Sequence, residues 1–143
     1  MNHTPDLQRQ AALDYAMRTS KANAKRFVWV TFQRPGFHHY PAASTEPVLA
    51  DVKYLGDRHR HLFKFKVQIE IFHNDREIEF HQLLNYCESL FGNKIDINSK
   101  SVEMLADDLF EVLAIRYPGR DMVIDVAEDG ECGCSIEYSS KQP

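Results

Sequence analysis

The sequence predicts an α+β fold in which two helices pack on one face of a four-stranded antiparallel sheet, after a separate N-terminal helix. Residues 59–72 alternate between apolar and polar side chains, which is typical of a strand with one buried face. Residues 80–91 and 102–113 instead repeat apolar side chains at spacings of three and four, as amphipathic helices do. Segments rich in β-branched and aromatic residues flank this helical region, so we expect the order strand, strand, helix, helix, strand, strand.

The composition is that of a single globular domain. The chain has 143 residues, of which 43% are hydrophobic and 27% are charged. Its net charge of −4, with both signs interspersed, argues against a nucleic-acid partner. No apolar run is long enough for a membrane span, and the polar start has no signal peptide. The three cysteines are odd in number, so we expect reduced thiols and a cytoplasmic location.

The N-terminal helix is expected to begin at Thr4-Pro5-Asp6, which combines a capping residue, a proline at the first helical position and an acid in the first turn. Its apolar stripe is modest and reaches about Ala24, so the helix should lie outside the domain or pack on a neighbouring subunit. We therefore divide the chain into a helical extension, residues 1–25, and one domain, residues 26–143.

The first strand is predicted over residues 27–33, which are rich in β-branched and aromatic side chains. The following Arg34-Pro35-Gly36 should break or bulge it. Residues 40–57 then form a long connection, and connections of that length in compact domains are often functional. The alternating strand of residues 59–72 comes next.

Glycine and serine mark the ends of the two later helices. Gly92 should end the first, and either Ser99 or Ser101 should cap the second. Two short strands complete the domain, over residues 122–126 and 134–138.

Four histidines suggest a metal site. His59 and His61 lie two apart on one strand, so their side chains leave the same face, and neutral imidazole is a common zinc ligand. His38 and His39 follow the preceding strand, whose end lies near the start of the next in an antiparallel pair. His38 shares the buried face if the strand is regular, whereas a bulge would favour His39. Three histidines with an open fourth position are typical of a catalytic or ligand-binding zinc site.

One carboxylate and the cysteines are further candidates. Glu128 ends a strand and could accept two hydrogen bonds from an amidine-like ligand edge, although it could equally belong to a solvated turn. Cys132 and Cys134 are possible metal ligands, but no second cysteine pair accompanies them. Cys87 falls on the apolar face of a helix and is expected in the core.

Four segments together resemble the 6-pyruvoyl and 6-carboxy-tetrahydropterin synthase family. Residues 59–63, His-Arg-His-Leu-Phe, resemble the family's His-Gly-His-x-Phe, and residues 37–41 resemble the segment that holds the first zinc histidine. Residues 101–106 resemble its Thr-x-Glu-x-Leu-Ala, and residues 124–128 its Val-x-Val-x-Glu. The resemblance covers residues 27–138, and it depends on the order and spacing of all four segments.

This resemblance implies a T-fold, whose subunits join edge to edge into rings. It implies a zinc ion on His38, His59 and His61, with Glu128 holding the edge of a pterin- or guanine-like ring in a pocket between subunits. The expected chemistry would be that of a carbon–oxygen lyase.

The chain departs from the family in its proton-transfer residues. Leu55 stands where the family has its catalytic cysteine, and residues 91–100 contain Asp96 but lack the histidine that pairs with it in the family. We therefore expect either a lyase with altered catalytic residues or, as the alternative, a non-catalytic protein that sequesters a pterin- or purine-like molecule. Candidates for the missing groups are Cys132, Cys134, His39, His73 and Asp57.

Overall fold

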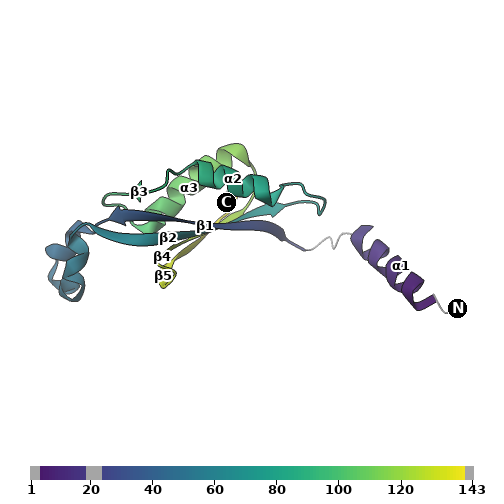
Figure 1. Cartoon of the computed structure of the whole chain (residues 1–143), viewed down its shortest axis with the longest axis horizontal. Helices are drawn as coiled ribbons and strands as arrows, with labels where there is room; N and C mark the ends of the chain where they lie inside the picture. The colour runs from purple at the N-terminus through teal and green to yellow at the C-terminus, as the bar shows by residue number, and fades with distance from the viewer. Residues whose placement is uncertain (1–3, 19–23, 141–143) are drawn as a thin grey trace.

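The N-terminal helix stands apart from the sheet. The computed structural model describes residues 4–18 and 24–140. Helix α1 spans Thr4–Arg18 with Asp6 in its first turn, as predicted, but Ala24 is no longer helical, and residues 19–23 lie outside the described residues. The side chains of Leu7 and Leu13 are exposed, and α1 stands clear of the sheet in Figure 1.

The domain is built on one mixed sheet of five strands in the order β3-β1-β2-β4-β5. The strands are β1 (Arg26–His38), β2 (His59–Ile71), β3 (Ile95–Asp96), β4 (Met122–Glu128) and β5 (Cys132–Tyr138). Neighbours among the four longer strands are antiparallel, whereas β3 pairs with β1 in parallel. The α+β class is therefore correct, but the prediction of a four-stranded, purely antiparallel sheet was wrong, because a two-residue strand adds to the β1 edge.

Strand β1 runs through Pro35 without interruption, so the predicted break or bulge does not occur. Each residue from Arg26 to His38 pairs with one residue of β2, and this register sets His38 opposite His59. A proline is tolerated in a strand where its missing N–H would face away from a partner strand. On its other side β1 pairs with β3 only at Gly36 and Phe37, so Pro35 breaks no pairing there.

Gly36 allows β3 to come close to β1. A Cβ atom on this residue would lie 2.6 Å from side-chain and backbone atoms of Ile95, and 2.9 Å from the ring of Phe63. Both contacts are shorter than side chains tolerate, so only glycine fits between β3 and the core.

Two helices cover one face of the sheet (Figure 1). Helix α2 spans Phe80–Ser89 and ends three residues before Gly92, the predicted stop. Helix α3 spans Val102–Arg116. Of its two candidate caps the structure uses Ser101, whose hydroxyl accepts a hydrogen bond from the amide of Met104 at 3.2 Å. This cap fixes the start of α3 beside the end of β1.

The core lies between the sheet and these helices. Its side chains come from alternate positions of β1, β2 and β4 and from the inner faces of α2 and α3. The largest fully buried ones are Phe63, Phe65, Ile69, Leu83, Leu113, Met122, Ile124, Val67, Val126 and Cys87. Phe32 stacks on Phe65 with ring centroids 4.7 Å apart.

The connection between β1 and β2 is ordered into two 3₁₀ segments, Pro41–Ser44 and Pro47–Gly56, where the sequence predicted only a long loop. They form a small lobe beyond the end of the β1–β2 hairpin (Figure 1). Val48 and Tyr54 are exposed on this lobe, while Ala43 is buried. The lobe brings Tyr40 close to Leu55, since the amide of Tyr40 donates to the carbonyl of Leu55 at 2.7 Å. In the described part of the chain, no helix has the length and apolar character needed to cross a membrane.

Candidate metal centre

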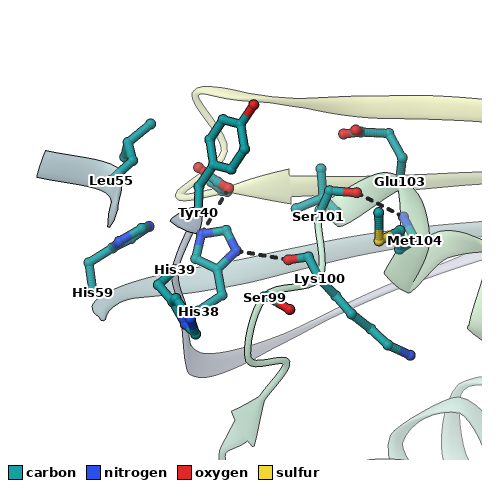
Figure 2. A pocket seen from close by; sticks show the side chains of 12 residues that line it. His38, His39, Tyr40, Leu55, His59, Ser99, Lys100, Ser101, Glu103 and Met104 are labelled. Atoms are coloured by element: carbon teal, nitrogen blue, oxygen red, sulfur yellow. Dashed lines mark hydrogen bonds and ion pairs between the residues drawn. The ribbon is translucent and has the colours of Figure 1, made fainter. Parts of the chain in front are cut away.

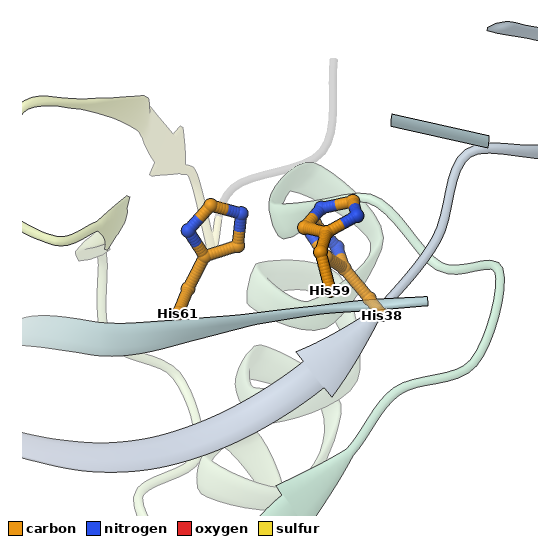
Figure 3. Close-up of side chains that lie close together, drawn as sticks. All are labelled: His38, His59 and His61. Carbon is orange, nitrogen blue, oxygen red and sulfur yellow. The ribbon is translucent and has the colours of Figure 1, made fainter. Parts of the chain in front are cut away.

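Three histidines gather at the end of the β1–β2 hairpin. His38 is the last residue of β1 and lies opposite His59, the first residue of β2, while His61 follows two residues later on the same face. Their ring centroids lie 4.5 to 5.1 Å apart, and all three rings stand on one side of the two strands (Figure 3). One nitrogen of each ring lies within 4.8 Å of the corresponding nitrogens of the other two. These histidines could hold a metal ion.

Each imidazole ring is held in place by a hydrogen bond at its Nδ1 atom. The Nδ1 atom of His38 lies 3.3 Å from the carbonyl oxygen of Lys100, and that of His59 lies 2.7 Å from the carbonyl oxygen of Asp57. The Nδ1 atom of His61 lies 2.6 Å from a carboxylate oxygen of Asp129. Because all three partners are acceptors, Nδ1 carries the proton in each ring and donates it. The Nε2 atoms of the three rings therefore remain available to bind a metal ion.

These Nε2 atoms fit a bound zinc ion. All three are buried, and none has a hydrogen-bond partner. A buried polar atom without a partner is costly, so native proteins rarely leave one, and still more rarely three together. Zinc takes neutral imidazole nitrogens as ligands, and metal-bound histidines almost always donate their second N–H to a carboxylate or carbonyl, as these do.

Glu128, the last residue of β4, faces two of these histidines. Its Oε1 atom lies 3.2 Å from Nε2 of His38, and its Oε2 atom 3.3 Å from Nε2 of His61. The side chain of Glu128 is three-quarters buried. The residue that the sequence suggested for binding a ligand therefore lies directly against the histidine cluster.

Asp129 is a site residue that the sequence did not suggest. One of its carboxylate oxygens accepts from His61, and the other accepts from the amide of Leu62 at 2.8 Å. Its own amide donates to the carbonyl of Leu62, also at 2.8 Å. These hydrogen bonds, with that from Leu62 foremost and that from His61 next, hold the pKa of the Asp129 carboxyl below its usual range. The carboxylate therefore stays ionised behind the imidazole.

Asp129 adopts the left-handed backbone conformation, with φ at 59°, and Gly130 follows at 72°. This tight turn between β4 and β5 aims the carboxylate back at β2. The Asp-Gly pair was visible in the sequence as a turn signal, and its position directly after Glu128 could have suggested a contact with His61.

Burial governs the charge of His38. Its side chain is nine-tenths buried, and desolvation lowers the pKa of its imidazole more than the nearby Glu128 carboxylate raises it. His38 is therefore held neutral, which is the state that a metal ligand needs.

A pocket of about 460 Å³ opens beside the histidines. Figure 2 shows Tyr40 and Leu55 on one side of it and residues from the start of α3 on the other. It is lined by His38, His39, Tyr40, Leu55, His59, Ser99, Lys100, Ser101, Val102, Glu103, Met104 and Glu128. The lining contains no cysteine, and Leu55 places an apolar side chain in the wall.

The other candidates lie outside the cluster. His39 lines the pocket but does not join the three clustered rings, so the structure brings together His38 rather than His39. Cys132 is exposed and Cys134 partly buried, and neither belongs to the metal-binding group formed by the described residues. His73 and His81 are exposed at the surface.

The third cysteine is a core residue, as predicted. Cys87 is fully buried on α2, and this burial raises the pKa of its thiol to about 12. It therefore contributes packing and no reactivity.

No protein-family model matches the chain, and no curated protein matches its sequence.

Proposed function

We propose that this protein holds one zinc ion on His38, His59 and His61 and uses it beside the pocket to bind a pterin- or guanine-like molecule. The observation that carries this proposal is the convergence of three buried Nε2 atoms that make no hydrogen bond, next to a pocket that also contains Glu128. Zinc would supply a Lewis acid that polarises an oxygen of the bound molecule.

Apart from β3, the architecture has the elements that the resemblance to the tetrahydropterin synthases implies. The four longer strands, β1, β2, β4 and β5, are sequential antiparallel neighbours, and both α2 and α3 cover the same face. The short strand β3 is then an addition at the β1 edge, made possible by Gly36.

The pocket has the size and chemistry for a flat heterocycle. Its volume of about 460 Å³ falls in the range of small-molecule sites. The side chains of Tyr40 and Met104 are each about half exposed at the pocket and offer apolar surface to the faces of a ring. Glu128 offers two acceptor oxygens to a ring edge that carries two N–H donors.

One observation favours a second candidate function, in which the protein captures its ligand without changing it. Leu55 occupies the pocket wall, and none of the residues lining the pocket carries a thiol. A lyase of the tetrahydropterin synthase type would need a proton-transfer group there. Capture and turnover would use the same binding site. They differ in whether the bound molecule is released unchanged, which one experiment can determine.

The first experiment measures zinc in the purified protein and identifies, by mass spectrometry, any small molecule released on denaturation. We expect about one zinc per chain and a pterin- or purine-like compound. Supplied ligand that is recovered unchanged indicates capture, whereas a converted product indicates a lyase. A purified protein with neither metal nor ligand would contradict the proposed function.

A double variant, His59→Ala/His61→Ala, tests the metal ligands themselves. It removes two of the three Nε2 donors from partly exposed positions near one end of β2, so the fold should survive. We expect loss of zinc with an unchanged far-ultraviolet circular dichroism spectrum. Full zinc retention would exclude this site.

The sheet edges support assembly into a ring of subunits. Residues 27–35 of β1 and all of β5 lie at opposite edges of the sheet, and no other described strand pairs with their outer sides. Beside the β1 edge lies an apolar groove of about 470 Å³ between β1 and α2. We infer that β5 of a second copy docks along this edge, because exposed edges tend to pair. The free thiols of Cys87, Cys132 and Cys134 fit the reducing environment of the cytoplasm, where we place the protein.

A further inference from the structure

The carboxylate of Glu128 lies at the point on which the clustered histidines converge. Its two oxygens lie 3.2 and 3.3 Å from the Nε2 atoms of His38 and His61. The protons of both rings are on Nδ1, where they face the carbonyl of Lys100 and the carboxylate of Asp129. The carboxylate is largely buried and faces the same two Nε2 atoms that would hold the metal, so its oxygens lie within reach of an ion bound there.

Backbone pairing fixes where this carboxylate lies. Glu128 pairs with Phe63 across the β4–β2 register, so its side chain leaves the sheet on the same face as His61. The next residue, Asp129, is tied to Leu62 by two hydrogen bonds of 2.8 Å, so the end of β4 cannot swing away from β2. The contact with the histidines thus follows from the fold as well as from the choice of rotamer.

We propose that Glu128 is the fourth ligand of the metal ion, which is then held by three imidazoles and one carboxylate when no small molecule is bound. This inference builds on the proposed zinc site and adds a second role to Glu128 besides holding the ring edge. Carboxylate oxygens are common zinc ligands alongside histidine. A cation bound between the Nε2 atoms and the carboxylate would give the buried negative charge of Glu128 an opposite charge.

The consequence is a metal without an open position in the resting protein. A ligand that binds the zinc must displace the Glu128 carboxylate, which is then free to accept hydrogen bonds from the ring edge. Metal binding and ring binding would therefore compete for one side chain. A site in which Glu128 only holds the ring would keep its metal affinity when this carboxylate is removed.

The test compares Glu128→Gln with a matched control, Glu131→Gln, in the full chain without added ligand. Glutamine keeps the size of the side chain but replaces the negatively charged carboxylate, the proposed metal ligand, with a neutral amide. The control removes the same charge from an exposed position three residues away in the same turn. Zinc affinity is measured by competition with a chromogenic chelator, and the coordination of a substituted cobalt(II) ion by its visible absorption spectrum.

We expect Glu128→Gln to bind zinc at least about tenfold more weakly and to change the cobalt spectrum, because even residues that only orient a ligand cost tenfold or more. Glu131→Gln should behave like the wild type. A Glu128→Gln protein with wild-type zinc affinity and cobalt spectrum would overturn the inference while leaving the three-histidine site intact. A wild-type protein that binds no zinc would overturn the proposed function itself.

A shorter carboxylate gives a second check if Glu128→Gln folds poorly. Glu128→Asp keeps the negative charge and withdraws it by one methylene. We expect a smaller loss of zinc affinity than with Gln, together with a changed cobalt spectrum. An Asp variant whose affinity and spectrum both match the wild type would overturn the inference.

Discussion

Asp129 acts on the candidate metal centre through His61. Its carboxylate oxygen accepts a hydrogen bond from Nδ1 of His61, at 2.6 Å from that nitrogen, and the carboxylate is itself fixed by the amide of Leu62. A carboxylate behind a metal-bound imidazole fixes the ring and increases the electron density on Nε2. We predict that Asp129→Asn lowers zinc affinity by about 10- to 100-fold, measured by chelator competition.

The control for this prediction is Asp125→Asn. Asp125 lies on β4, four residues before Asp129. Its carboxylate accepts a hydrogen bond from the hydroxyl of Ser135 rather than from a histidine. Equal zinc affinities for the two variants would show that Asp129 only stabilises the turn. A purely structural role would lower thermal stability without moving the ratio of metal-bound to free protein.

At the level of single residues, the alternation of side chains along a strand is enough to predict the clustered histidines, but not the groups that hydrogen-bond to their Nδ1 atoms. His38 could be favoured over His39 because side chains alternate along a regular strand, and β1 is regular. The partners of the Nδ1 atoms are two backbone carbonyls and Asp129, which lies 68 residues from His61. Backbone carbonyls are present at every residue and so give no sequence signal. An Asp-Gly pair predicts a turn whether or not its aspartate hydrogen-bonds to a metal-binding histidine.

Strand β3 depends on a single glycine in its neighbour β1. A methyl group on Gly36 would meet Ile95 at 2.6 Å and the ring of Phe63 at 2.9 Å. We predict that Gly36→Ala destabilises the protein by about 1–3 kcal/mol, because backbone atoms of β3 and a core ring must move apart. Chemical denaturation measures the loss.

Gly92→Ala is the matched control, since a Cβ atom there would meet only a carbonyl oxygen, at an ordinary 3.7 Å. We expect it to leave the free energy of unfolding within about 0.5 kcal/mol of the wild type. If Gly36→Ala and Gly92→Ala were equally stable, β3 and Phe63 would be able to move apart at no cost to make room for a side chain at position 36.

The errors in the predicted elements have two physical causes. Pro35-Gly36 predicts a break because both residues are rare inside strands. At an edge, proline breaks no pairing, and glycine is required where another strand comes close. Strand β3 has only two residues, too few for any periodicity, so it was missed. The long elements were predicted in the right order because each carries its own apolar repeat.

Acid stability of the whole domain should depend on Glu77. Arg120 donates to its carboxylate at 2.8 Å, and this hydrogen bond is the main reason that the pKa of Glu77 is lowered to about 2. The amides of Phe72 and His73 also donate to it. A carboxyl with a depressed pKa stabilises the fold above pH 4.5, its value when unfolded, and this contribution is lost as the pH falls towards 2.

We predict that Glu77→Gln lowers the free energy of unfolding at pH 7 by about 2 kcal/mol, and that its difference from the wild type shrinks between pH 4.5 and pH 2. Urea denaturation across this pH range measures both effects. If the difference in free energy of unfolding between the wild type and Glu77→Gln stayed constant with pH, the charge of the Glu77 carboxylate would not stabilise the folded state.

The assembly of whole molecules can be tested at the groove beside the β1 edge. Phe80 lines this groove and is half exposed at the first position of α2. We predict that the wild-type protein is an oligomer in size-exclusion chromatography with light scattering, and that Phe80→Glu reduces it to smaller species. A charge in the groove opposes docking of a second copy, while an acid in the first turn of a helix leaves the fold of the subunit intact.

Ile115→Glu provides the comparison, because Ile115 is the more exposed of the two apolar side chains and lies on α3, away from the groove. This variant should keep the wild-type molecular mass. If both variants keep it, the groove is not the contact between subunits. If Phe80→Glu dissociates and loses ligand but keeps zinc, the pocket is completed by the neighbouring subunit while the three histidines bind metal within one chain.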